Sequence, residues 1–127
     1  MTARDEADRL LRRIALDRHQ CQRCGAVRDP AYMDTAHIIR RGYAATRCDE
    51  DNVWLLCHEP CHRLADSSTI EHAALVARTI GEDHYRGLYA RAHAGPPEAL
   101  SLWWPAERAR LRARCKELGL SLRGAAA

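Results

Sequence analysis

Apolar residues recur along this chain at two spacings, which predict a helix at the start and a short hairpin after it. The first stripe has helical spacing, so residues 3 to 18 are predicted to form an amphipathic helix rather than a solvated arm. Its apolar members are Ala3, Ala7, Leu10, Leu11 and Ile14. Residues 32 to 39 and 53 to 56 flank a stretch rich in Gly, Arg and Asp and are predicted to pair as two strands.

The second half of the chain is predicted to be helical, which makes the expected fold class α+β. A first short helix is expected from Cys61 to about Asp66, and Ser68-x2-Glu71 resembles a capping box that opens the next one. The core stripe expected on that next helix consists of Ile70, Ala73, Ala74, Ala77 and Ile80. A further helix should bury Tyr85, Leu88, Tyr89 and Ala92.

The chain breaks at Gly95-Pro96-Pro97, and Pro105 is predicted to start the last helix because proline suits a first helical position. The core stripe of this helix is expected to hold Trp104, Leu111, Cys115 and Leu118. With 127 residues, the chain fits one compact domain. Its segments are an N-terminal helix over 1–20, a central core over 21–67 and a helical extension over 68–127.

Four cysteines predict a structural zinc site. Cys21-x2-Cys24 and Cys57-x3-Cys61 are two short knuckles, which together supply the four thiolates of a tetrahedral Zn²⁺ ion. The alternative, a pair of disulfides, is disfavoured because the N-terminus is charged and no apolar run is long enough for a signal peptide or a membrane span. We therefore expect a cytoplasmic protein that does not enter a membrane.

Charge adds a weak indication of a nucleic-acid partner. The formal net charge is only +3, but residues 101 to 127 carry six basic and two acidic side chains. A basic segment beside a nearly neutral body is compatible with a phosphate-binding edge.

Two familiar zinc patterns do not fit. A C2H2 finger would need a second histidine three to five residues after His37, where the chain has Arg41, Gly42 and Tyr43 in range. A nucleobase deaminase would need His-x-Glu and Pro-Cys-x2-Cys, whereas His58 and Glu59 are adjacent here.

The remaining motif resembles that of HNH endonucleases, most closely the phage-type members with a zinc knuckle. It consists of Cys21-x2-Cys24-Gly25, then Asp34-Thr35-Ala36-His37-Ile38-Ile39-x-Arg41, then Asp51-Asn52-x3-Leu56-Cys57-x3-Cys61-His62. The motif core covers residues 21 to 66. This resemblance implies a ββα-metal fold, in which a hairpin and a helix hold one divalent ion against a scissile phosphate.

The resemblance also implies roles for individual residues. His37 would be the general base that activates water, and Asn52 would tether the loop that positions His37. His62 would bind the catalytic ion, which is expected to be Mg²⁺ or Mn²⁺. Asp66 lies four residues after His62, on the same helical face, and is expected either to be a second ligand or to be an ordinary surface carboxylate.

One position departs from the family pattern. Many members carry a metal-binding Asp or His immediately before the general base, where this chain has Ala36. Asp34 is the candidate substitute; otherwise His62 and Asp66 suffice, or the site is degenerate. Arg40, Arg41 and Arg47 are candidates for phosphate contacts, with Arg41 matched by the family pattern. His58 is expected to occupy an exposed turn without a function.

The leading hypothesis is a metal-dependent endonuclease that nicks or cuts double-stranded DNA. The alternative is a noncatalytic zinc-stabilised module that binds nucleic acid or a phage assembly partner through a degenerate site. An RNA-directed nuclease would share the same active site and remains a third possibility.

Overall fold

A computed structural model describes residues 1–123 and confirms the α+β class. The α-helices in this range are α1 (Ala3–Leu16), α2 (Ala44–Arg47), α3 (Arg63–Ser67), α4 (Thr69–Arg78), α5 (Glu82–Ala94) and α6 (Leu100–Glu117). The strands are β1 (Met33–His37) and β2 (Val53–Cys57), and short helical turns lie at Pro30–Tyr32, Glu50–Asn52 and His58–His62. No helix within residues 1–123 is both long enough and apolar enough to cross a membrane.

The two predicted strands form an antiparallel hairpin with a helix directly after it. Met33 pairs with Cys57 and His37 with Val53, so the two ends of β1 face the knuckle and the tip of the hairpin respectively. All five residues of β2 are buried. Val53 packs in a cluster with α1 and α6, whereas Trp54, Leu55 and Leu56 pack with α3 and α4. The hairpin is therefore the element to which the other layers attach.

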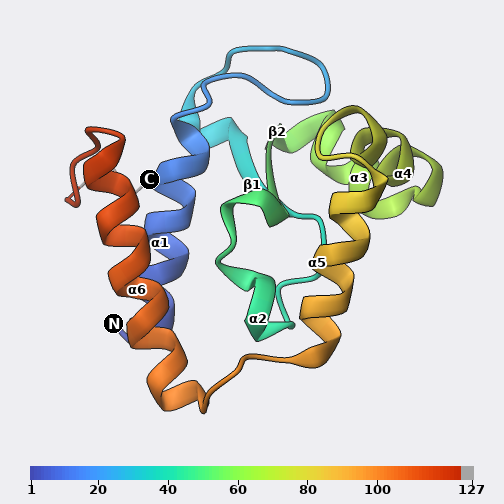
Figure 1. Cartoon of the computed structure of the whole chain (residues 1–127). Helices are drawn as coiled ribbons and strands as arrows, with labels where there is room; N and C mark the ends of the chain where they lie inside the picture. The colour runs from blue at the N-terminus through green and yellow to red at the C-terminus, as the bar shows by residue number, and fades with distance from the viewer. Residues whose placement is uncertain (124–127) are drawn as a thin grey trace.

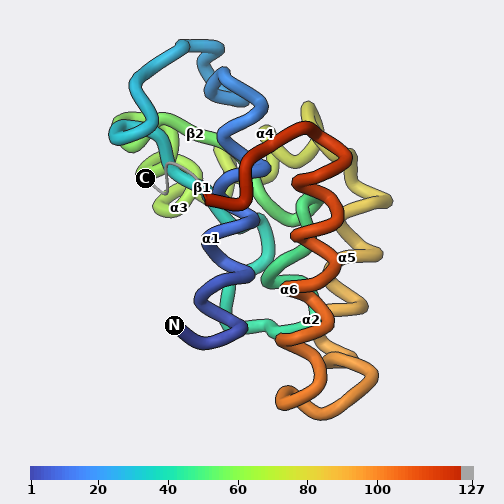
Figure 2. Tube along the Cα trace, turned by 90° about the vertical axis from the view of Figure 1, so that its left-hand side faces the viewer, coloured from blue at the N-terminus to red at the C-terminus, as the bar shows by residue number. Residues whose placement is uncertain are grey.

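Helices α1 and α6 lie side by side and run in the same direction, on the opposite side of the hairpin from α5 (Figures 1 and 2). Leu10, Leu11 and Ile14 of α1 meet Leu111 and Cys115 of α6 in one buried cluster. The predicted N-terminal helix and the C-terminal stripe are thus confirmed. Their contact joins the two ends of the described chain into one layer.

The core stripe predicted for α4 is wrong at four of its five positions; the fifth, Ile80, follows the helix and packs against the core. Ile70 is 81% exposed, and Ala73, Ala74 and Ala77 are also exposed. The side that packs on the hairpin carries instead His72, Leu75, Val76 and Thr79. Its two polar members are hydrogen-bonded, since His72 Nε2 lies 3.0 Å from the Ile38 carbonyl oxygen and the Trp54 indole donates to Thr79 Oγ1. The buried face of α4 therefore combines two apolar residues with two hydrogen-bonded polar residues.

The predicted start of the last helix is also wrong, because α6 begins at Leu100 and contains Pro105 in its second turn. Proline there removes one backbone donor from the helix. Tertiary contacts hold the preceding turn helical: the Trp103 indole donates to the Ala44 carbonyl over 3.0 Å, and Trp104 packs against the buried cluster of α1 and α6.

Candidate functional site

The four cysteines of the two knuckles lie together and fit one zinc ion. Cys21 and Cys24 come from the loop after α1, Cys57 ends β2, and Cys61 lies in the turn before α3. All four sulfur atoms lie within 4.8 Å of one another, and the Sγ atoms of Cys24 and Cys57 are 4.0 Å apart. Zn–S bonds of about 2.3 Å in a tetrahedron imply sulfur separations of about 3.8 Å. The four cysteines are free thiols in this structure, and their common convergence suits one ion rather than two separate disulfide bonds.

The protein surroundings favour the thiolate at Cys21, whereas burial raises the pKa of Cys61 to about 12. Burial acts to raise the pKa of Cys21, but hydrogen bonds from the backbone of Cys24, Cys57 and Arg23 outweigh it and lower that pKa to about 6. The Arg23 guanidinium donates to the sulfur of Cys61 over 3.5 Å and pairs with Glu71 at 3.2 Å. This pairing uses the carboxylate expected to complete the capping box of α4, so Glu71 links that helix to the knuckle instead.

A second cluster of metal-binding side chains lies beside the first. One carboxylate oxygen of Asp34 is 2.6 Å from Nδ1 of His62 and 2.7 Å from Nδ1 of His58. The three ligand atoms are within 4.8 Å of one another. Burial tends to raise the pKa of Asp34, but the hydrogen bonds from both histidines outweigh burial and lower it. One carboxylate and two imidazoles are a donor set suited to a divalent transition metal, and three protein ligands leave positions open for water or phosphate.

His58 is the member of this cluster that sequence reasoning missed. It was expected to lie in an exposed turn, and its side chain is indeed 67% exposed, but that turn directs it to Asp34. Helical spacing does not explain this placement, because Glu59 between the two histidines has an extended backbone and the segment is kinked. Asp66 lies on the other side of His62, with its carboxylate 3.3 Å from Nε2. The Nδ1 and Nε2 atoms of His62 therefore face two different sets of ligands.

His37 lies at the end of β1 and is half-buried. Its Nε2 atom is 2.9 Å from the Arg47 carbonyl oxygen. Burial lowers the pKa of His37, helped by the nearby charge of Arg41 and opposed by the hydrogen bond to Arg47. The imidazole is consequently neutral near pH 7, with Nδ1 available to accept a proton.

Asn52 is fully buried and joins the two ends of the segment that follows β1. Its Oδ1 atom accepts a hydrogen bond from the Ile39 amide over 2.8 Å. Its Nδ2 atom donates to the carbonyl oxygens of Ile39 and Thr46 over 3.1 and 3.0 Å. Because Thr46 directly precedes Arg47, these bonds fix the carbonyl group that holds His37.

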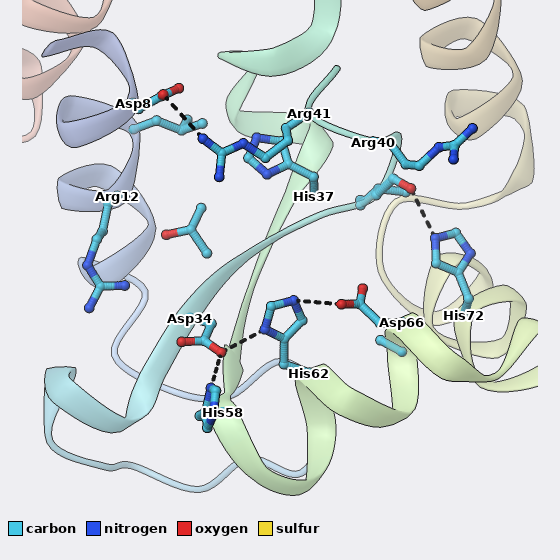
Figure 3. A pocket seen from close by; sticks show the side chains of 14 residues that line it. Asp8, Arg12, Asp34, His37, Arg40, Arg41, His58, His62, Asp66 and His72 are labelled. Carbon is cyan, nitrogen blue, oxygen red and sulfur yellow. Dashed lines mark hydrogen bonds and ion pairs between the residues drawn. The ribbon is translucent and has the colours of Figure 1, made fainter. Parts of the chain in front are cut away.

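These groups share one open pocket of about 940 Å³ (Figure 3). His37 lines one part of its wall, and Asp34, His58, His62 and Asp66 line another. The remaining lining residues are Asp8, Leu11, Arg12, Thr35, Ile38, Arg40, Arg41, Ala65 and His72. The structure thus brings together most of the site residues predicted from the sequence.

Of the three arginines predicted to contact phosphate, Arg47 is the one that does not line this pocket. Its guanidinium forms two hydrogen bonds, of 2.9 and 2.6 Å, with the carboxylate of Asp8 on α1. Only 12% of the Arg47 side chain is exposed. Arg41 is different: its side chain is 66% exposed and lies 3.7 Å from the same carboxylate. A phosphate could therefore contact Arg41 directly. To contact Arg47, it would have to break the partly buried ion pair with Asp8.

Ala36, which departs from the family pattern, is 2% exposed and packs in the core beside Trp54, its partner across the hairpin. A ligand at this position would have to leave that core. Asp34, two residues earlier, supplies the carboxylate of the cluster instead.

No protein-family model, no curated protein and no solved structure matches this chain. The functional interpretation therefore rests on the geometry of the pocket.

Proposed function

We propose that this protein hydrolyses phosphodiester bonds in DNA, with His37 as the general base. The observation that supports this proposal best is the shared pocket: a neutral, oriented imidazole and a separate Asp34–His58–His62 cluster line the same open space. Phosphodiester hydrolysis requires a base for water and a positive charge at the phosphate. The resemblance to HNH endonucleases makes the same prediction from the sequence.

His37 accepts a proton from the attacking water at Nδ1. The Arg47 carbonyl can only accept a hydrogen bond, so the proton of the neutral ring is on Nε2 and the lone pair is on Nδ1. Burial keeps the ring unprotonated before the reaction. The resulting imidazolium is stabilised by the same carbonyl group, which remains its hydrogen-bond acceptor.

Asp34, His58 and His62 would hold the catalytic divalent ion. When bound, such an ion supplies positive charge to the phosphate and to the leaving oxygen. Two imidazoles among three ligands favour Mn²⁺ over Mg²⁺, which prefers oxygen ligands. Cys21, Cys24, Cys57 and Cys61 would hold a structural zinc ion, which would also fix this second cluster, because His62 directly follows Cys61 and His58 directly follows Cys57.

Arg40 and Arg41 bind the phosphates that flank the cleaved bond. Both line the pocket, and arginine side chains suit phosphate oxygens because they donate two parallel hydrogen bonds. Arg40 forms no ion pair with any residue in the described range 1–123. Its charge is therefore available to a polyanion.

A plasmid assay tests the proposal. Zinc-loaded protein incubated with supercoiled plasmid and Mn²⁺ or Mg²⁺ should convert it to the nicked or linear form, and His37→Ala should lose at least about a hundredfold in rate. His84→Ala is the matched control, since His84 is an exposed histidine on α5 that lies outside the pocket. Parallel reactions with RNA separate the two substrates. Nicking that is undiminished in His37→Ala would reject the assignment.

The second candidate is a noncatalytic module that binds nucleic acid or a phage assembly partner. Ala36 favours it, because an apolar core residue stands where many HNH enzymes have a metal ligand. This candidate predicts DNA binding that survives His37→Ala and no cleavage with either metal.

A further inference from the structure

We propose, resting on the function above, that a row of aromatic side chains beside the pocket stacks on unpaired bases, so that the preferred substrate carries a single-stranded segment next to the cleaved bond. This row, called here the aromatic surface, consists of Tyr43, Tyr85, Tyr89 and His93. Tyr43 lies in the loop between β1 and α2, within the range of the motif core, and the other three residues lie on α5.

The rings of the aromatic surface form a continuous series along α5. Tyr85, Tyr89 and His93 are spaced four residues apart, which places them on one face of the helix. Tyr89 stacks on His93 with ring centroids 4.1 Å apart, and His93 is 4.8 Å from Tyr43. Tyr85 and Tyr89 are 6.5 Å apart. From Tyr85 to His93 the helix rises by about 12 Å, which is long enough for two or three stacked nucleotides.

The aromatic surface is supported by the core but faces solvent. Leu88 and Ala92 of α5 are buried against Ile39, and Tyr43 and Tyr85 pack on this cluster. The prediction that Tyr89 is buried is wrong, because its exposed fraction is 50%, and His93 is also exposed. A stacking surface needs this combination, because rings fixed in place lose little conformational freedom when a base covers them.

Both ends of the aromatic surface connect to the pocket. At one end, Tyr85 lies edge-on to His72 at 6.1 Å, and His72 lines the pocket wall. At the other end, Tyr43 follows the loop that carries Arg40 and Arg41. Figure 3 shows Arg40 extending from this loop toward the side of the pocket on which His72 lies. A strand held by Arg40 at a phosphate would therefore meet the rings with its neighbouring bases.

The chemistry selects unpaired nucleic acid as the occupant. Bases in a duplex are already stacked on both faces, whereas an unpaired base has a free π-face for Tyr or His. Arg40, which forms no ion pair within residues 1–123, and the pocket cluster match a polyanion rather than an apolar helix of another protein.

A binding experiment without added divalent ion tests this proposal independently of cleavage. Zinc-loaded protein is titrated into an oligothymidine that contains one fluorescent adenine analogue, whose emission is quenched by stacking, and into a duplex of equal length. Tyr89→Ala should weaken single-strand binding about fivefold or more and abolish the quenching. Tyr89→Phe, which keeps the ring, should bind within about twofold of the wild type.

Leu102→Ala is the control, because Leu102 is a comparably exposed apolar residue on α6. The proposal is overturned if wild-type protein does not quench the probe, if Tyr89→Ala binds the single strand as the wild type does, or if it loses duplex affinity equally. The two proposals fail separately. Quenching that depends on Tyr89 in a protein that cleaves nothing rejects only the nuclease activity, whereas cleavage without quenching rejects only the stacking.

Discussion

The Nε2 atom of His37 lies 2.9 Å from the carbonyl oxygen of Arg47, and this contact determines which nitrogen of the ring is free. Arg47 is in turn held by Asp8 on α1, a residue outside the HNH-like motif. The orientation of the proposed base therefore depends on the N-terminal helix as well as on the hairpin.

The pKa of His37 should lie below its ordinary value of 6.5, because burial disfavours the imidazolium. Protonation then favours the unfolded chain. The stability that this residue contributes is complete above about pH 6.5 and is lost as the pH falls from 6.5 through the lower folded pKa. An NMR titration of the imidazole measures the pKa, and urea unfolding as a function of pH should show a shallower acid slope in His37→Gln. A His37 pKa above 6.5 would contradict this account.

Zinc at the four cysteines should contribute a large part of the folding free energy. Cys57→Ser replaces a buried ligand, so the bound zinc should be lost and the free energy of unfolding should fall by about 3 kcal/mol or more. Elemental analysis and urea unfolding measure the two effects. Cys115→Ala is the matched control: this thiol is also buried, but it lies outside the cluster, so its zinc content should be that of the wild type. Unchanged zinc content in Cys57→Ser would reject the site.

The outcome for each element shows what sequence patterns can predict in this chain. Spacing in the sequence located the hairpin and the apolar stripe of α1, because both follow a local periodic pattern. It also located the cysteine cluster, because each of its two knuckles is a short local motif. It failed on α4, where His72 and Thr79 face the core through hydrogen bonds to partners distant in the sequence. It also failed on His58, whose role depends on a strand pairing that brings Asp34 to the turn after β2. These errors arise from tertiary contacts, which a single helix does not encode.

His58 should bind the catalytic ion more strongly than Asp66 does. His58→Ala removes one of three ligand atoms in the Asp34 cluster and should weaken Mn²⁺ binding about tenfold or more. Asp66→Ala should leave the affinity within about twofold, because its carboxylate faces the Nε2 atom of His62, away from that cluster. Titration of zinc-loaded protein with Mn²⁺, followed by electron paramagnetic resonance, measures both. The reverse order of effects would place the ion on the Nε2 side.

Arg41 and Arg47 should give opposite phenotypes. Arg41→Gln removes an exposed charge from the pocket, so DNA binding should weaken while the free energy of unfolding changes little. The slope of the logarithm of the binding constant against the logarithm of the salt concentration should decrease in magnitude by about one. Arg47→Gln leaves the Asp8 carboxylate without its close partner and should lower the free energy of unfolding by about 2 kcal/mol or more. Salt-dependent binding and urea unfolding of both variants check this. Equal stability losses would contradict the distinction.

Asn52 should stabilise the loop through its amide group as well as through its size. Asn52→Asp keeps the volume but cannot donate to the carbonyl oxygens of Ile39 and Thr46, and it places a carboxylate beside them in the core. The free energy of unfolding should fall by about 3 kcal/mol or more. Asn52→Ala leaves the Ile39 amide and both carbonyls without this partner, at about 1 to 3 kcal/mol for each group that remains buried.

Hydrogen exchange separates this role from a general loss of stability. The Ile39 amide should lose protection in both variants by more than the global destabilisation requires, whereas amides in α6 should follow the global change. The Arg47 carbonyl, one residue after Thr46, would then be less well fixed, so the His37 resonances should broaden or shift. Ile39 protection that merely follows global unfolding would show that the segment is held by other contacts.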